Sequence, residues 1–498
     1  MRSRRWPPKP RPIAWTIAGS DSGGGAGIQA DLKTMNTLGV HGCSLVTSLT
    51  AQNSQGIANI EHTSPDFIQE QFDALLTDMP PTAIKIGMLG SPEMVEQVAE
   101  RLFNIEVFKI LDPILFSSSG TRLLDEKAIQ AFMSLMLPSA SLLTPNIPEA
   151  QSLLGLEIET AADVEKAGEQ LLMWGAQSVL IKGGHLDNPS FSQDYWTNGI
   201  EKAWLTSPRI DTENTHGTGC VLSSAIASAT ALGYHLLDAL VIAKTYLNQA
   251  LRHGYAPGQG KGVLAHPGWP ESADDLPWIT DTAEAGRQRP SFARLDEEPL
   301  GLYPIVDRFE WVKKLVPLGV KTLQLRVKDL EGDELETEIR QSIDLARDSG
   351  CRLFINDAWE LALKHDAWGV HLGQDDLEEA DLNQLADAGL RLGLSTHSFT
   401  EIARAMAYNP SYIALGTLFQ TTSKTMDYSP LGLPAFERMR KVVPVPAVAI
   451  GGITLERAPD VIAAGADGCA VISDIREADD LPDRVAQWLD RLEKMRRR

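Results

Sequence analysis

Residues 324–328 read "QLRVK", an apolar strand-like run that carries three polar side chains, Gln324, Arg326 and Lys328. Apolar runs of this kind recur through the second half of the chain, with a plausible helix after each. They begin near Leu302, Lys321, Arg352, Trp368, Arg391, Tyr412, Ala447 and Cys469. Eight strand–helix units in about 200 residues are typical of a compact (β/α)8 TIM barrel.

Polar residues gather where these runs end, in "IND", "HLGQDD", "STH", "FQTTSK", "AIGGI" and "VIS". Because the carboxyl ends of parallel strands meet at one face of a barrel, we expect these residues to lie together there. Asp357 and Asp376 follow neighbouring strands, where two carboxylates favour a Mg²⁺ ion shared with a diphosphate. Arg326 and Lys328 indicate a diphosphate clamp, although cations paired with nearby acids are the ordinary alternative.

The first half of the chain alternates strand-like and helix-like segments. Strands are predicted at "AWTIAG", "CSLVTS", "AIKIG", "FKILD", "SLLTP" and "SVLIKGG", with helical runs such as "IQADLKTMNTLG" and "PDFIQEQFDALLTDM" between them. This alternation predicts a second α/β domain, an αβα layer structure whose mostly parallel sheet carries helices on both faces. Ligands of such a sheet bind beyond the carboxyl ends of its strands.

The chain of 498 residues is too long for one core and fits two domains. Between the two patterns, "ESADDLPWITDTAEAGRQRPSFARLDEEP" is polar, contains proline and lacks periodicity, as linkers do. We therefore expect a disordered tail over residues 1–12, a first domain over 13–268, a linker over 269–300 and the barrel over 301–498.

Bulk properties narrow the class of protein. The net charge of −21 argues against nucleic-acid binding, and no apolar run of about 18 residues predicts a membrane span. The basic N-terminus lacks the apolar stretch of a secretory signal. Four cysteines lie far apart without a zinc or redox motif, which favours the cytoplasm, with Cys43, Cys351 and Cys469 as small core residues. Nothing in the sequence excludes a homo-oligomer.

Several segments of the first domain indicate an anion-binding site. Residues 18–34, "AGSDSGGGAGIQADLKT", form a glycine-rich loop that leads into a helix, with Asp31 one turn inside it. Asp31 either faces a ligand or complements the helix dipole, and Gln52 either binds an aminopyrimidine edge or is a solvated amide. Glu149 in "TPNIPEA" and Lys182 in "IKGGH" lie near strand ends of the same sheet, where Lys182 is a candidate for ATP phosphates.

The segment "NTHGTGC", residues 214–220, is a glycine-rich turn that precedes the helical run "VLSSAIASATALG". A turn of this kind points backbone N–H groups at an anion, so Gly217, Thr218 and Gly219 predict an anion hole. A phosphoryl-transfer enzyme is expected to carry a carboxylate near this point as a proton acceptor, yet the sequence has Cys220.

Together these segments resemble the hydroxymethylpyrimidine and phosphomethylpyrimidine kinase family of the ribokinase-like fold, over residues 12 to 267. The motifs are "TIAGSDSGGGAGIQADLKT", "TAQNSQG", "KIGML", "LTPNIPEA", "KGGH" and "NTHGTGC". The resemblance implies that Lys182 and the Thr218–Cys220 turn serve the ATP phosphates and the transfer itself. The stretch "DPILFSSSG", Asp112–Gly120, departs from the family's usual sequence. Pyrimidine contacts are implied for Gly19, Asp31 and Gln52.

The resemblance also suggests a reason for a cysteine at position 220. The family is expected to phosphorylate a hydroxymethyl group first and then the resulting phosphate monoester, whose second pKa is about 6. A carboxylate would repel that second acceptor. We hypothesise that Cys220 is neutral for the phosphate and partly ionised for the hydroxyl. A small buried residue that shapes the turn is the alternative.

The barrel closely resembles thiamine phosphate synthase over residues 301 to 490. That family joins hydroxymethylpyrimidine diphosphate to thiazole phosphate and releases diphosphate. The resemblance implies that Asp357 and Asp376 bind Mg²⁺. It implies diphosphate and pyrimidine contacts for Gln324, Arg326, Lys328, Asn356, Ser395 and Lys424. Positions for thiazole phosphate are matched by Thr421, Ser423, Gly452, Ile472 and Ser473.

The product expected from the first domain is the substrate expected for the second. We therefore interpret the chain as a bifunctional transferase of thiamine biosynthesis whose small-molecule substrates are hydroxymethylpyrimidine, ATP and thiazole phosphate. Two alternatives stand beside it: a pyridoxal-type kinase in the first domain, and the decay of one domain into a ligand sensor or scaffold. Asp31 and Gln52 argue against the first alternative, and the carboxylates and cations of the barrel argue against the second.

Overall fold

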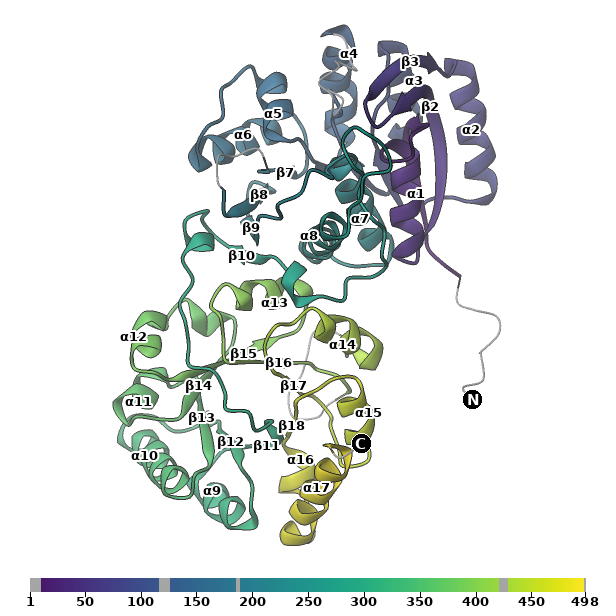
Figure 1. Ribbon diagram of the computed structural model, residues 1–498. Helices are drawn as coiled ribbons and strands as arrows, with labels where there is room; N and C mark the ends of the chain where they lie inside the picture. The colour runs from purple at the N-terminus through teal and green to yellow at the C-terminus, as the bar shows by residue number, and fades with distance from the viewer. Residues whose placement is uncertain (1–9, 116–125, 185–188, 421–428, 497–498) are drawn as a thin grey trace. The chain divides into compact units, whose positions relative to one another are not determined.

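The computed structural model describes residues 10–115, 126–184, 189–420 and 429–496. The chain divides into two compact units, which Figure 1 shows as a ribbon. The first unit holds Met1–Pro270 and Asp275–Arg287, and the second holds Glu271–Asp274 and Gln288–Arg498. Within the described ranges, no helix is long and apolar enough to cross a membrane.

The first unit contains a sheet of ten strands in the order β10-β9-β8-β7-β6-β5-β4-β1-β2-β3. The pairs from β2 through β1, β4, β5 and β6 to β7 are parallel, and the pairs beyond them at both edges are antiparallel. The strands are β1 (Ile13–Asp21), β2 (His41–Asn53), β3 (Gly56–His62), β4 (Ala83–Ile86), β5 (Phe108–Leu111), β6 (Leu142–Leu143), β7 (Val179–Ile181), β8 (Phe191–Thr197), β9 (Lys202–Pro208) and β10 (Trp278–Thr280).

Helices cover both faces of this sheet. Alternate side chains of a strand point to opposite faces, so a strand can pack against helices on both sides. Trp15 and Ile17 of β1 belong to an apolar core with Phe72 and Val95, whereas Thr16 points the other way and donates to Asp31 of α1. The helices are α1 (Gly27–Thr37), α2 (Pro65–Asp78), α3 (Pro92–Phe103), α4 (Glu126–Ala131), α5 (Ile147–Leu154), α6 (Ala161–Met173), α7 (Thr218–Ala231) and α8 (Leu236–Arg252).

The strand β10 lies inside the segment 269–300 that the sequence predicts to be a linker. Trp278 and Ile279 are buried, β10 pairs with β9, and the Trp278 indole donates to the carbonyl of Gly286 over 2.7 Å. Residues 275–287 therefore belong to the first unit, and the linker expectation is wrong for them. A strand of three residues is too short to show the alternation by which strands are identified in a sequence.

The second unit is a closed barrel of eight parallel strands in chain order, as expected. Each strand begins within one residue of its predicted start. The strands are β11 (Gly301–Val306), β12 (Thr322–Leu325), β13 (Arg352–Asn356), β14 (Gly369–Leu372), β15 (Arg391–Thr396), β16 (Tyr412–Leu415), β17 (Ala447–Ala449) and β18 (Gly468–Val471).

Helices surround the barrel (Figure 1). Aromatic rings fill part of its interior. The rings of Tyr303, Phe354 and Tyr412 lie 5.0–6.0 Å apart. Gly393 makes room for them, since a Cβ there would lie 2.2 Å from the Tyr412 ring. The helices are α9 (Phe309–Leu315), α10 (Gly332–Asp348), α11 (Trp359–Lys364), α12 (Leu382–Asp387), α13 (Phe399–Met406), α14 (Gly432–Lys441), α15 (Ala458–Ala463), α16 (Ser473–Arg476) and α17 (Leu481–Arg496).

Candidate functional sites

A cavity of about 700 Å³ opens in the first unit, where loops follow the carboxyl ends of its parallel strands. Its lining includes the glycine-rich loop after β1, the end of β2, the Lys182 turn and the start of α7. Seven of the residues expected in this site line it together: Gly19, Gln52, Lys182, Gly217, Thr218, Gly219 and Cys220.

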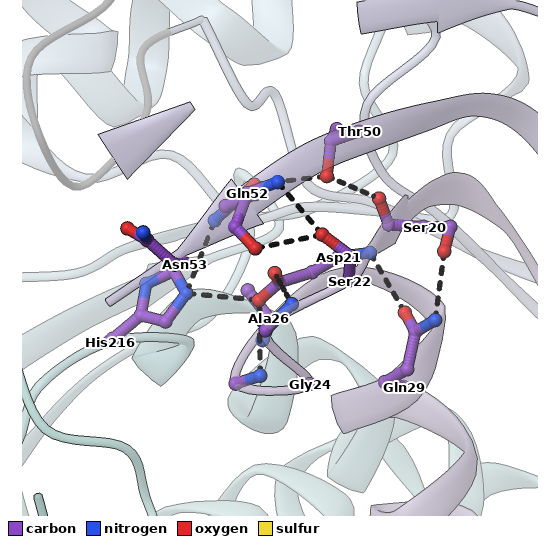
Figure 2. A network of polar contacts seen from close by, with 12 residues as sticks. Ser20, Asp21, Ser22, Gly24, Ala26, Gln29, Thr50, Gln52, Asn53 and His216 are labelled. Atoms are coloured by element: carbon purple, nitrogen blue, oxygen red, sulfur yellow. Dashed lines mark hydrogen bonds and ion pairs between the residues drawn. The ribbon is translucent and has the colours of Figure 1, made fainter. Parts of the chain in front are cut away.

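The carboxylate of Asp21 organises the glycine-rich loop, as Figure 2 shows. It accepts backbone N–H groups of Gly23, Gly25 and Ala26 over 2.8–3.0 Å, and its Oδ2 lies 3.1 Å from Nε2 of His216. Burial raises the pKa of Asp21, but the hydrogen bonds from His216 and from the backbone outweigh it and hold the pKa below its usual value. The loop is thus fixed by an ionised carboxylate.

The loop and the end of β2 form one wall of the cavity. Gln52 lies with its Nε2 3.4 Å from the His216 ring, and its Oε1 accepts from the hydroxyl of Thr50 over 3.3 Å (Figure 2). A larger residue at position 19 would displace neighbouring side chains, because its Cβ would lie 2.6 Å from the end of Met88 and 2.8 Å from the Ser48 hydroxyl. Gly19 and Gln52 both line the cavity.

Lys182 forms the cationic centre of the cavity. Its ammonium group donates to Asp112 over 2.9 Å and lies 3.8 Å from Glu149. Asp112 also accepts from the hydroxyls of Thr144, over 3.4 Å, and Ser223, over 3.2 Å. Burial raises the pKa of Glu149 to about 7, against the influence of Lys182 and with the support of Asp112. The ammonium group of Lys182 therefore lies between two buried acids.

The start of α7 also lines the cavity and packs against the glycine-rich loop. Gly217 precedes the helix with φ at 89°, and a Cβ there would lie 2.0 Å from the carbonyl oxygen of Gly25. Cys220 lies in the first turn of this 14-residue helix and is buried. Burial raises the pKa of the Cys220 thiol to about 11, although Lys85 acts in the other direction. Burial therefore favours the neutral thiol over the partly ionised form that the hypothesis assigns to the first step.

Asp31 is buried beneath the residues that line the cavity, and its expected contact with the pyrimidine stays a prediction. Its carboxylate is fully buried and accepts from Thr16 over 2.6 Å, from Lys85 over 2.8 Å and from Ser224 over 2.6 Å. These three donors join β1, β4 and α7 to α1. The residue is a buried structural anchor behind Cys220.

The sequence interpretation missed several polar residues of this cavity. Asp21 carries the signal of an Asx turn, an aspartate two residues before a glycine whose N–H it binds. Asp112 and His216 lie within motifs of the sequence analysis in which other residues were the candidates. No sequence signal marks the buried pair of Lys244 and Asp194, whose charged atoms lie 2.6 Å apart in the cavity wall.

In the barrel, the expected metal ligands follow two paired strands. Asp357 comes after β13 and Asp376 after β14, and Asn356 lies opposite His371 in the register of these strands. The carboxylate of Asp357 pairs with Lys328, and Asp376 accepts the backbone N–H of Gly373 over 2.8 Å. The described part of the chain holds no cluster of three or more metal-ligating side chains. Two carboxylates alone would therefore need ligand oxygens from a substrate.

The other expected residues of the barrel site divide between its interior and its rim. Gln324 is buried inside β12, whereas Arg326 is exposed beyond the end of that strand. The side chain of Ser395 contacts His371, with Oγ of Ser395 2.9 Å from Nε2 of His371. Gly452, Ile472 and Ser473 follow β17 and β18. The expected residues Thr421, Ser423 and Lys424 lie outside the described residues.

Comparisons with known proteins match each half of the chain to a protein family. The family model described as Phosphomethylpyrimidine kinase matches residues 21–265, and the one described as Thiamine monophosphate synthase matches residues 302–475. A thiamine biosynthetic bifunctional enzyme of Arabidopsis thaliana, named as chloroplastic, is 35% identical over 483 residues, which cover 94% of this chain and 90% of that protein. The chain belongs to the bifunctional thiamine biosynthetic enzymes.

Separate relatives exist for the two halves of this bifunctional enzyme. The thiamine-phosphate synthase of Photorhabdus laumondii is 54% identical over 194 residues, which cover 39% of this chain and 90% of that protein. The solved pyridoxal kinase of Staphylococcus aureus in complex with ADP has a TM-score of 0.50 and 28% identity, and the match covers 54% of this chain and 98% of that one. The predicted kinase and synthase pair and the ribokinase-like and barrel folds are thus confirmed, and the alternative functions are not favoured.

Proposed function

We propose that the first unit uses ATP to phosphorylate 4-amino-5-hydroxymethyl-2-methylpyrimidine twice, and that the barrel couples the resulting diphosphate with thiazole phosphate. The product of the second reaction is thiamine phosphate, with diphosphate released. We place both reactions in the cytoplasm. The observation that supports the kinase half is one cavity in which Gln52, Lys182 and the start of α7 face the same space.

The division of roles follows from the chemistry of these groups. The amide of Gln52 offers both a donor and an acceptor, which matches the edge of an aminopyrimidine. Lys182 supplies positive charge to the phosphates, and the first turn of α7 supplies N–H groups that have no partner inside the helix. Phosphoryl transfer has a loose transition state, so positioning and charge stabilisation matter more than a strong base.

The neutral thiol of Cys220 suits the second acceptor better than the first. A phosphate monoester already carries its nucleophilic oxygen at neutral pH. A thiol whose pKa is raised to about 11 adds no charge beside it. The proton of the first acceptor, a hydroxymethyl group, then passes to an oxygen of the transferred phosphoryl group and not to a thiolate. Cys220 therefore shapes the turn and avoids repulsion of the monophosphate.

The residues of the barrel fit a Mg²⁺ ion bound together with a diphosphate. Asp357 and Asp376 would hold it, because hard carboxylate oxygens on adjacent strand ends suit this cation. Bound there, Mg²⁺ supplies charge stabilisation to the departing diphosphate. Asp357 has a φ of 61°, in the left-handed region that aspartate tolerates better than most residues. This conformation places its carboxylate beside Lys328.

In the barrel, the side chains of the protein bind and orient the substrates. Arg326 and Lys328 lie on the exposed rim after β12, where a guanidinium and an ammonium can grip diphosphate oxygens. Gln324 and Ser395 face the pyrimidine in this proposal. The ring amino group pushes electrons toward the CH2 as diphosphate leaves, and the thiazole nitrogen attacks that carbon. No protein nucleophile takes part.

The test uses the whole chain with ATP, Mg²⁺ and hydroxymethylpyrimidine, with and without thiazole phosphate. We expect monophosphate and then diphosphate without thiazole phosphate, and thiamine phosphate with it. Pyridoxal in place of the pyrimidine is expected to give much slower turnover. Faster turnover of pyridoxal would favour a pyridoxal-type kinase, whose fold the first unit shares. Absence of turnover by one unit would favour a sensor or scaffold role for it.

A further inference from the structure

A chain of hydrogen bonds crosses the interior of the barrel through side chains of five strands. Nε2 of Gln324 donates to the hydroxyl of Tyr303 over 3.3 Å, and the hydroxyls of Tyr303 and Tyr412 lie 2.6 Å apart. The Tyr412 hydroxyl lies 2.7 Å from Nδ1 of His371, and Nε2 of His371 lies 2.9 Å from the hydroxyl of Ser395. Both ends of the chain, Gln324 and Ser395, are expected pyrimidine contacts.

The middle of this chain is sealed from solvent. Tyr303 is 1% exposed, Tyr412 0% and His371 5%. The ring of Phe354 packs against both tyrosines, at centroid distances of 6.0 and 5.0 Å. Gly393 leaves the space that the Tyr412 ring occupies. Buried polar groups need hydrogen-bond partners, so each of these pairs must consist of one donor and one acceptor.

The direction of donation then follows step by step. Because Tyr303 accepts from the Gln324 amide, its own proton goes to the oxygen of Tyr412. Tyr412 in turn gives its proton to Nδ1 of His371, which must be the unprotonated nitrogen. A neutral imidazole then carries its proton on Nε2 and donates to Ser395. The hydroxyl of Ser395 accepts inside the barrel and keeps its proton for a ligand.

We propose that Tyr303, Tyr412 and His371 are positioning residues that fix the direction of hydrogen bonding in the synthase site. Ser395 is thereby a donor to a ring nitrogen of the substrate. Gln324, with one N–H committed to Tyr303, keeps its Oε1 as an acceptor for an amino group. This inference rests on the proposed synthase function of the barrel.

The fixed direction matches the chemistry of an aminopyrimidine. The amino group donates, and the ring nitrogen beside it accepts, so an acceptor from Gln324 and a donor from Ser395 meet them as partners. Reversal of the Gln324 amide would reverse every step. Ser395 would then donate to His371, and only its oxygen lone pairs would be left to face the acceptor nitrogen of the ring. The buried chain therefore selects for the aminopyrimidine over a ring without that nitrogen.

The tautomer of His371 tests the direction without any substrate. Nitrogen NMR of the full chain labelled with ¹⁵N-histidine would report it, and His371→Gln identifies its signals among the ten histidines. We expect a protonated Nε2 and a bare Nδ1. Tyr412→Phe removes the donor to Nδ1 and should give a mixture of tautomers, whereas Phe354→Leu disturbs packing alone and should not. A protonated Nδ1 in the unsubstituted protein, or an unchanged tautomer in Tyr412→Phe, would overturn the proposal.

The same variants test the consequence for recognition. The probe is the pyrimidine diphosphate with C–H in place of the ring nitrogen beside the amino-bearing carbon. We expect the protein to prefer the natural ring in kcat/KM by about tenfold or more. Ser395→Ala should abolish this preference, Tyr412→Phe should reduce it, and Phe354→Leu should keep it while lowering Tm. A preference retained by Ser395→Ala would overturn the proposal. Absence of synthase turnover in the unsubstituted protein would reject the proposed function instead, while the tautomer measurement would still decide the direction.

Discussion

The charge of residue 220 should affect the two phosphoryl acceptors, the hydroxymethyl group and the phosphate monoester, differently. Its thiol is neutral because burial raises its pKa to about 11. We predict that Cys220→Asp slows the second phosphorylation more than the first. Two like charges about 4 Å apart repel by roughly 4 kcal/mol at an effective dielectric constant near 20. Even a third of that repulsion is about a tenfold loss of rate. Separate rate measurements with hydroxymethylpyrimidine and with its monophosphate check this.

The matched control for this change is Cys220→Ser, which keeps a small neutral group at the start of α7. Its two rates should fall together, so their ratio should stay close to that of the unsubstituted protein. Equal losses of both steps in Cys220→Asp would show that position 220 matters only for the shape of the turn.

Glu149 makes the stability of the first unit depend on pH. Burial raises its pKa from 4.5 to about 7, so the folded protein binds this proton more tightly than the unfolded chain does. The contribution of Glu149 to stability is therefore present below pH 4.5 and is lost as pH rises towards 7. We predict that Glu149→Gln becomes more stable relative to the unsubstituted protein across this window, by on the order of 2 kcal/mol. Unfolding measured from pH 5 to 8 checks this.

Glu149 closes a capping box with Asn146 at the start of α5, so a second residue of this kind serves as the control. Asp163 closes an exposed capping box with Thr160 at the start of α6, where hydrogen bonds from Thr160 lower the pKa of Asp163. Asp163→Asn should show no gain that grows with pH over the same range. A flat difference between Glu149→Gln and the unsubstituted protein would mean that the Lys182 ion pair keeps Glu149 charged throughout.

At the scale of elements, β10 shows that the first unit extends beyond residue 268, its predicted end. We predict that a fragment of residues 1–287 folds and keeps both kinase steps, whereas a fragment of residues 1–270 is less stable. The shorter fragment loses the buried indole of Trp278 and the ion pair of Arg252 with the buried Asp275. Loss of a buried aromatic side chain alone costs about 3–5 kcal/mol. Equal Tm values for the two fragments would show that β10 adds nothing to the sheet.

The sequence predicts elements better than it predicts contacts. The eight strands of the barrel are identifiable because strands buried on both faces are continuous apolar runs separated by helices. The short strand β10 carries too few residues for any pattern. In the kinase cavity, Gln52 and Lys182 line one space, as their position at strand ends leads us to expect. The hydrogen bonds of Asp31 could not be predicted in the same way, because its partners Lys85 and Ser224 come from distant parts of the chain.

At the scale of the whole molecule, two active sites in two compact units should respond separately to substitution. Asp376→Ala removes an expected Mg²⁺ ligand from the barrel, and we predict a loss of roughly 3 kcal/mol of transition-state stabilisation, about a hundredfold in kcat/KM of the coupling step. The dependence of that step on Mg²⁺ concentration should move to higher values. Both phosphorylation rates should stay unchanged, since the kinase cavity is lined only by residues of the first unit.

Asp375→Ala, at the exposed neighbouring carboxylate, is the matched control and should retain coupling. Normal coupling with normal Mg²⁺ dependence in Asp376→Ala would remove this residue from the metal site, and a parallel loss of kinase activity would show that the two units do not act independently.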